Sequence, residues 1–151
     1  MKKAFVDYRK AKEIAENYPT PFYLYDEEGI RETVRNLYKA FSWNEGYREY
    51  FAIKATPNPA ILRILKEEGC GVDCSSAAEL SLAEACGFSG SEIMFSSNDT
   101  PDEEYGFANR LGGIINLDDF TNIDEVTEIL TTLPKTMSLR FNPGGYFSIG
   151  N

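Results

Sequence analysis

The chain has 151 residues, of which 42% are hydrophobic and 26% charged, and its formal net charge is −9. This composition is typical of a globular domain with its own core. The negative charge argues against nonspecific nucleic-acid binding, which needs clustered Lys and Arg. No apolar run approaches the roughly 18 residues of a membrane span, and the start lacks the apolar core of a signal peptide. We therefore expect a cytoplasmic protein.

The residue types that are scarce or missing limit the chemistry. The chain contains no histidine, so it supplies no histidine base or triad of its own, and a zinc or iron site is not expected. The cysteines are odd in number and lie inside or beside predicted regular elements, at Cys70, Cys74 and Cys86. We interpret them as buried free thiols rather than as disulfides or metal ligands.

The first part of the chain precedes the regular pattern. Apolar spacing predicts a helix over residues 1–18, which Pro19 and Pro21 end. The aromatic run 21–26 (PFYLYD) is typical of a short strand. A second helix follows, and residues 43–50 connect it to the next element. The apolar stripe of this second helix consists of Ile30, Val34, Leu37 and Phe41.

A regular alternation of strands and helices begins at Tyr50. Four strand segments are each followed by a helix, and a fifth strand follows the last helix. The predicted strands are 50–56, 71–75, 92–97, 113–117 and 136–142, and the predicted helices are 58–68, 76–86, 101–111 and 122–130. Helix starts are marked by Asn58-Pro59 and by capping-box patterns at 76–79 and 100–103, and stops by Gly69 and Gly112. Strands joined in this way pair in parallel through right-handed crossovers.

The strand spacing of about 20 residues favours an α/β barrel of the TIM (β/α)8 type. A doubly wound open sheet is the alternative, but no Gly-x-Gly-x-x-Gly motif follows the first strand. A barrel needs eight strands and about 250 residues, whereas this chain supplies five strands, which cannot close. We therefore expect about five βα units that form the N-terminal part of a barrel in a larger enzyme.

Side-chain alternation predicts a site at the carboxyl ends of the strands, where barrels place their function. Ala52, Lys54 and Thr56 share one face of the first strand, and the same rule points Asp73 and Arg140 into the same interior. An amine, a carboxylate and a guanidinium are costly to bury together without a task. An internal salt-bridge network is the alternative interpretation.

Lys54 is the centre of this prediction. Burial at a strand end disfavours the ammonium form, and a neutral amine in a dry pocket is what Schiff-base chemistry requires. The alternative is a structural lysine whose stem packs while its head reaches water.

The sequence around the first predicted strand resembles the family of ornithine, arginine and diaminopimelate decarboxylases. Residues 50–69 resemble the family's pyridoxal-phosphate attachment segment, and residues 71–80 resemble its next motif. Residues 139–144 and 21–26 resemble segments of the diaminopimelate branch. Thr56 departs from the pattern, because the family usually has asparagine there.

The resemblance implies a barrel of the alanine-racemase type, of which this chain is the first part. Residues 1–26 would form a helix and strand that join a C-terminal β domain in the complete enzyme. Residues 27–151 would form a partial barrel that binds pyridoxal 5'-phosphate (PLP). The family's stacking histidine, its glycine-rich phosphate loop, its acidic partner of the pyridine nitrogen and the cysteine lent by a second subunit would come later. We expect that residues 1–151 alone neither bind PLP tightly nor turn over a substrate.

The resemblance also implies roles for individual residues. Lys54 matches the catalytic lysine that bonds covalently to the cofactor, and Asp73 matches an acidic residue close to both. Arg140 matches an arginine near the phenolic oxygen of the cofactor ring, where it would favour the ionised oxygen. Glu79 matches a family glutamate too, although capping is an adequate account of it. Further residues at predicted strand ends that could line the mouth are Ser97, Asn98 and Asp118.

The activity that the resemblance implies is decarboxylation of a small amino acid, most closely of meso-diaminopimelate to lysine, by a homodimeric enzyme. Alternatives within the same fold are decarboxylation of carboxynorspermidine, arginine or ornithine, and amino-acid racemisation. A non-enzymatic carrier that holds PLP through Lys54 is an alternative of another class. Carriers of this kind are complete barrels without the opening aromatic strand.

Overall fold

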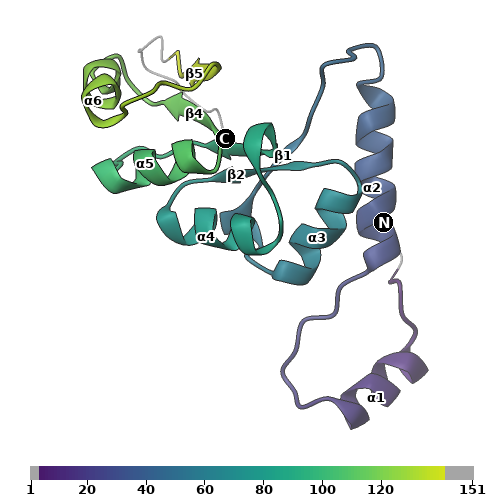
Figure 1. The fold of residues 1–151 in the computed structure, drawn as a ribbon. Helices are drawn as coiled ribbons and strands as arrows, with labels where there is room; N and C mark the ends of the chain where they lie inside the picture. Colours follow the sequence, from purple (N-terminus) through teal and green to yellow (C-terminus); the bar gives the residue numbers. More distant parts are fainter. Residues whose placement is uncertain (1–3, 142–151) are drawn as a thin grey trace, which may run out of the picture.

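The computed structural model describes residues 4–141. Within these residues, five strands form one parallel sheet in the order β1-β2-β3-β4-β5, and a helix joins each strand to the next (Figure 1). The strands are β1 (Tyr50–Ala52), β2 (Gly71–Cys74), β3 (Ile93–Phe95), β4 (Ile114–Leu117) and β5 (Met137–Leu139). The predicted α/β fold with five parallel strands is confirmed.

The crossover helices begin close to the predicted positions. They are α3 (Pro59–Glu67), α4 (Ala77–Ala85), α5 (Asp102–Arg110) and α6 (Asn122–Ile129). Asn58 caps α3 by accepting from the Ala60 amide at 2.9 Å. The predicted capping box at Thr100 is wrong, because α5 begins after Pro101, which has no side-chain oxygen to cap it. None of the described helices is both long and apolar enough to cross a bilayer.

The four crossover helices cover one face of the sheet, and the main hydrophobic core lies between them and the strands. Strand residues that supply this core are Val72, Cys74, Ile93, Phe95, Ile115 and Leu117. Fully burying one such side chain contributes about 1.5–3 kcal/mol. A doubly wound sheet carries helices on both faces, so the one-sided arrangement favours the barrel.

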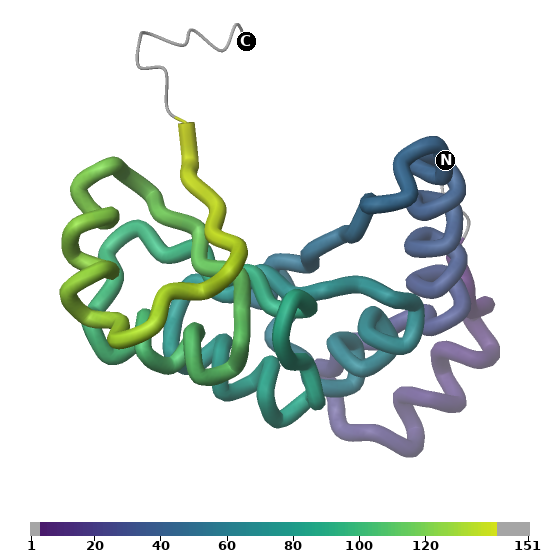
Figure 2. Tube along the Cα trace, turned by 45° about the horizontal axis from the view of Figure 1, so that its top comes forward, coloured from purple at the N-terminus to yellow at the C-terminus, as the bar shows by residue number. Residues whose placement is uncertain are grey.

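Two helices precede the sheet and lie at its β1 end, whereas β5 lies at the other end (Figure 2). These helices are α1 (Tyr8–Asn17) and α2 (Glu27–Ala40). α1 starts later than predicted because Asp7 caps it, accepting from the Lys10 amide at 2.7 Å.

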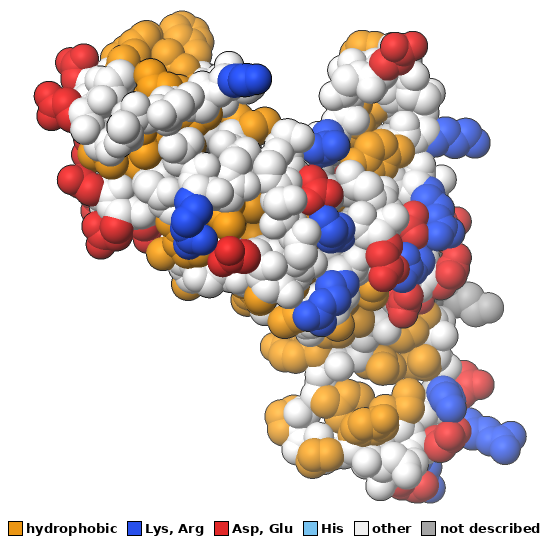
Figure 3. Space-filling view, in the orientation of Figure 1, with side chains coloured by type: hydrophobic (Ala, Val, Ile, Leu, Met, Phe, Trp, Pro, Cys, Tyr) orange, Lys and Arg blue, Asp and Glu red, His pale blue; other side chains and the backbone are white. Residues whose placement is uncertain are grey.

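The aromatic run 21–26 is not a strand, which corrects the prediction. Its residues have irregular backbone structure, and within residues 4–141 no strand pairs with it to form a hydrogen-bond ladder. The side chains of residues 21–25 are exposed, that of Tyr23 to 89%. Figure 3 shows hydrophobic side chains gathered over this N-terminal part, while acidic ones gather at the edge that carries α5 and α6.

α2 packs on α3 through an apolar contact that includes Val34 and Ile61. Charged side chains form hydrogen bonds beside this apolar contact. Glu68 accepts from Arg35 at 2.7 Å and from Arg31 at 3.0 Å. These two hydrogen bonds hold the pKa of Glu68 below its ordinary value. The contact ties the segment before the sheet to the first crossover helix.

β1 is shorter than the predicted strand 50–56. The chain leaves the sheet after Ala52 and forms a 3-10 turn, Ile53–Ala55, in which the Thr56 amide donates to the Ile53 carbonyl at 3.0 Å. After Ala52 this turn takes the place of further β1–β2 pairing. Side-chain alternation therefore does not extend to Lys54, which is exposed rather than buried.

The three cysteines are buried and unpaired, as predicted. Burial raises the pKa of Cys74 to about 12 and that of Cys70 to about 11. Both thiols therefore stay protonated at neutral pH and pack as small apolar groups.

Candidate functional site

The face of the sheet opposite the helices is polar. Alternate strand residues point to it and surround a hollow of about 300 Å³. The residues around the hollow are Tyr50, Asp73, Met94, Ser96, Asn116, Ser138 and Arg140. In a barrel this face is the interior, and its carboxyl edge is where active sites are found.

Asp73 lies on β2 in this polar face. Its Oδ1 atom is buried and has no hydrogen-bond partner among the described residues. Burial raises the pKa of Asp73, and the Glu79 carboxylate raises it further, whereas the positive charges of Lys54 and Arg140 lower it. Lys54 and Arg140 thus both lie within electrostatic reach of one carboxylate. Asp73 and Arg140 border the same hollow, and Ala52, two residues before Lys54, is the register partner of Asp73.

Lys54 lies directly after β1, in the 3-10 turn at the carboxyl edge of the sheet. Its side chain is exposed, so the predicted burial of the amine is wrong for the described chain. The physical reason is that β1 is an edge strand here, with β2 as its one neighbour within residues 4–141. The predicted position at the carboxyl edge, beside Asp73, is retained.

Arg140 follows β5 and reaches across the polar face to β3 and β4. Its guanidinium pairs with the Asp118 carboxylate, and it donates to Asn98 Oδ1 at 3.3 Å and to the Ser96 hydroxyl at 3.2 Å. The predicted mouth residues Asn98 and Asp118 therefore contact a site residue. Ser97 is buried and forms no side-chain hydrogen bond with this group in the described part of the chain.

Glu79 supports the turn between β2 and α4. Its carboxylate accepts from the Ser75 amide at 2.8 Å, and its own amide donates to the Ser76 hydroxyl at 3.4 Å. In a regular capping box the glutamate accepts from the amide of the N-cap residue, here Ser76. Glu79 instead accepts from the amide one residue earlier. The contacts within residues 4–141 give Glu79 a structural role and place its charge near Asp73.

Ser96, Asn116 and Ser138 also belong to the polar face, and the sequence analysis did not single them out. Each lies at an inward position by strand alternation, where a barrel usually has apolar residues. This break in the pattern is the signal that identifies them in the sequence.

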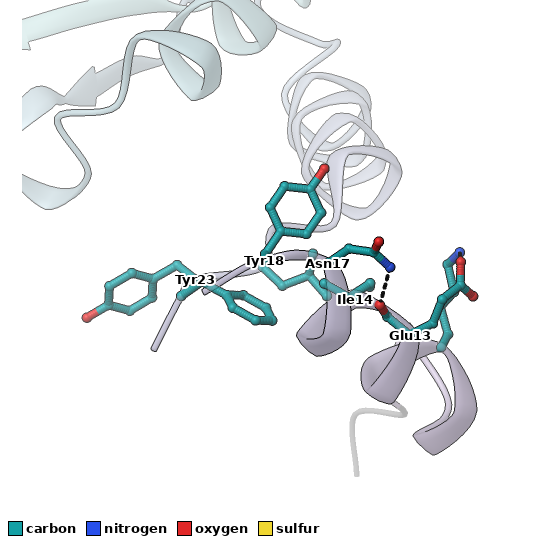
Figure 4. A pocket seen from close by; sticks show the side chains of 8 residues that line it. Glu13, Ile14, Asn17, Tyr18 and Tyr23 are labelled. Atoms are coloured by element: carbon teal, nitrogen blue, oxygen red, sulfur yellow. Dashed lines mark hydrogen bonds and ion pairs between the residues drawn. The ribbon is translucent and has the colours of Figure 1, made fainter. Parts of the chain in front are cut away.

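A larger hollow, of about 710 Å³, lies between α1 and residues 22–24, away from the carboxyl edge (Figure 4). The labelled contact there is local: the Asn17 amide donates to the Glu13 backbone carbonyl at 2.7 Å. Volume therefore does not locate the site, whereas the grouping of Lys54, Asp73 and Arg140 does.

A parallel sheet with helices on one face and charged groups at the carboxyl edge of the other defines part of a barrel of the TIM type. Residues 27–147 match the family described as "pyridoxal-dependent decarboxylase, pyridoxal binding domain". The chain is 44% identical over 133 residues to protein TabA of Pseudomonas amygdali pv. tabaci. It is 39% identical over 134 residues to diaminopimelate decarboxylase of Methanothermobacter thermautotrophicus.

Each of these alignments covers 88% of this chain but only 30% of TabA and 31% of the decarboxylase. The crystal structure of diaminopimelate decarboxylase from M. jannaschi has a TM-score of 0.72 and 30% identity, and the match covers 79% of this chain and 29% of that one. The chain therefore belongs to the pyridoxal-dependent decarboxylase family and spans about a third of the length of its relatives, as their N-terminal part.

The residues of the site fit the cofactor for which the family domain is named. Lys54 offers an amine to an aldehyde, and Arg140 offers a guanidinium to an anionic oxygen. The buried, unpartnered Oδ1 of Asp73 is an acceptor without a donor in the described chain, as expected of a group that serves a ligand. The cofactor predicted from the sequence, PLP, is that of the family.

Proposed function

We propose that the full-length protein is a PLP-dependent decarboxylase that converts meso-diaminopimelate to lysine. The observation that supports this most is that Asp73 and Arg140 border one hollow while Lys54 follows β1 at the same carboxyl edge, within a matched pyridoxal-binding domain. When bound, PLP supplies an electron-poor ring that accepts the electron pair left by departing carbon dioxide.

The residues of this chain would bind and orient the reacting groups. Lys54 Nζ would hold the aldehyde carbon of the cofactor and, once released, move a proton at that same nitrogen. Asp73 would attract and orient the Lys54 amine, since its register partner Ala52 lies only two residues before Lys54. Arg140, held by Asp118, would stabilise an anionic oxygen.

The substrate assignment has two supports. The segments 139–144 and 21–26 resemble the diaminopimelate branch, and a diaminopimelate decarboxylase is 39% identical over 134 residues. TabA, at 44% identity, carries a different name. The choice of substrate therefore needs a direct assay.

The test measures carbon dioxide release by the purified full-length protein with PLP, using meso-diaminopimelate, lysine, ornithine, arginine and carboxynorspermidine. We expect kcat/KM for meso-diaminopimelate to exceed the others by at least about a hundredfold. Preference for another amino acid would overturn the assigned substrate but leave the assigned reaction, decarboxylation, in place. Binding of PLP without carbon dioxide release from any of these substrates would contradict decarboxylase activity and favour a PLP carrier.

We also propose that residues 27–151 form the partial barrel, and that residues 1–26 join a C-terminal β domain. The exposed aromatic side chains of 21–26 support a partner for this segment. A homodimer is the assembly that the family resemblance favours, and sedimentation of the full-length protein tests it. The cytoplasmic location proposed from the sequence is tested by cell fractionation.

A further inference from the structure

Three small polar side chains form a hydrogen-bonded chain across the polar face of the sheet. The Ser138 hydroxyl donates to Asn116 Oδ1 at 2.7 Å, and Asn116 Nδ2 donates to the Ser96 hydroxyl oxygen at 3.3 Å. Asn116 and Ser138 are register partners on β4 and β5, and Ser96 directly follows β3. The series of hydrogen bonds therefore connects three neighbouring strands.

The orientation of the Asn116 amide is fixed by this arrangement. The amide accepts on one side and donates on the other. An ionised aspartate accepts only, and leucine does neither, so neither residue reproduces both bonds. Polar groups in a barrel interior cost free energy unless they are hydrogen-bonded. Here each of the three side chains has a hydrogen-bond partner.

The hydrogen-bonded chain ends on Arg140. Nη2 of Arg140 donates to the same Ser96 oxygen, at 3.2 Å. On the other side, Nη1 pairs with Asp118 and donates to Asn98. Because the guanidinium is planar, contacts at two of its nitrogens fix its plane. Asn116 holds the Ser96 oxygen that receives one of these contacts.

We propose that Asn116 is a positioning residue for Arg140, acting through Ser96, so that the guanidinium faces the interior and meets an anionic oxygen of the bound cofactor. This inference rests on the proposed function, because it takes PLP as the interior ligand. A merely structural role of Asn116 in joining β3, β4 and β5 predicts lower stability but unchanged properties of the bound ligand.

The test follows the visible absorbance of PLP bound to the full-length protein as the pH is varied. We expect Asn116→Leu to raise the midpoint of this titration by about one pH unit, because an oxygen that loses a nearby cation ionises less readily. Arg140→Lys is expected to shift it in the same direction, because a lysine ammonium lacks the planar guanidinium that Asp118, Asn98 and Ser96 hold in place. In the Arg140→Lys background, Asn116→Leu is expected to add no further shift, because its effect passes through Arg140.

Ser138→Ala removes only the hydrogen bond to Asn116 Oδ1, which is the one farthest from Arg140. It is therefore expected to give a smaller shift of the titration midpoint. Asn36→Asp, an exposed change on α2, is the matched control and is expected to leave the midpoint unchanged. If Asn116→Leu does not fold, Ser96→Ala, which removes the shared acceptor, replaces it.

An unchanged midpoint in Asn116→Leu, or a full shift that persists in the Arg140→Lys background, would overturn the positioning role while leaving the proposed function intact. A wild-type protein that does not bind PLP would overturn the proposed function itself, and the inference with it.

Discussion

In the full-length protein, Lys54→Ala is expected to lower the rate of decarboxylation by at least about a thousandfold. The variant removes the amine that would hold the cofactor and return a proton, and nothing else in the described chain places an amine beside Asp73. The visible absorbance of bound PLP is expected to disappear as well. Steady-state assays and absorbance spectra of the purified variant check both expectations.

The fold is expected to tolerate this substitution. Lys54 is exposed, and its turn is anchored by Ile53, which is fully buried. The melting temperature of the cofactor-free variant should therefore match that of the wild type. Lys39→Ala, an exposed lysine in the last turn of α2, is the control and should retain full activity. Turnover of Lys54→Ala at the wild-type rate would rule out the proposed mechanism.

Asp73→Asn is expected to change activity and stability in opposite directions. The neutral amide no longer attracts and orients the Lys54 amine, so activity should fall by about a hundredfold. The substitution also removes a half-buried carboxylate whose buried Oδ1 has no partner in the described chain. The melting temperature of the cofactor-free protein at pH 7 should therefore rise, by roughly 2 °C.

The sign of the pH dependence follows from the pKa of Asp73, which burial raises in the folded protein. Below the ordinary pKa of about 3.9, the wild-type side chain is neutral in both the folded and the unfolded state, so the variant has no advantage. As the pH rises through the folded-state pKa, the wild type loses stability that Asp73→Asn keeps. The difference between their melting temperatures should grow from pH 4 to pH 7.

Asp119→Asn is the matched control with the opposite sign. The Thr121 amide donates to Asp119 at 3.0 Å and the Thr121 hydroxyl at 3.1 Å, and these bonds lower the pKa of Asp119. The stability they contribute is present above the ordinary pKa and is lost as the pH falls. This variant should therefore be less stable than the wild type at pH 7. Equal and parallel pH profiles for both variants would contradict the account of Asp73.

Much of the fold follows from local signals in the sequence. Apolar strand segments and caps such as Asn58 predicted the five strands and four crossover helices, because short-range spacing decides which residues face the core. The inward positions of Asp73 and Arg140 followed from alternation. Where the chain follows regular strand geometry, the sequence is sufficient to predict which residues face the site.

The errors share a different physical cause. The segment 21–26 has strand-like residues, but a strand forms only when a neighbour supplies its hydrogen bonds. Lys54 was placed by alternation, which fails once the chain leaves the sheet at Ile53. The contacts between Ser96 and Asn116 join separate strands, so no local pattern encodes them. These features depend on long-range packing, and Lys54 also lies at an edge of the described sheet.

The attachment of the cofactor to Lys54 is tested most directly by borohydride reduction of the PLP-loaded full-length protein, followed by peptide mass spectrometry. Reduction makes the bond between an amine and the cofactor aldehyde permanent. The expected result is one phosphopyridoxyl group on the peptide that contains Lys54. A group fixed on another lysine, or none at all, would contradict the role of Lys54 from which the proposed function is built.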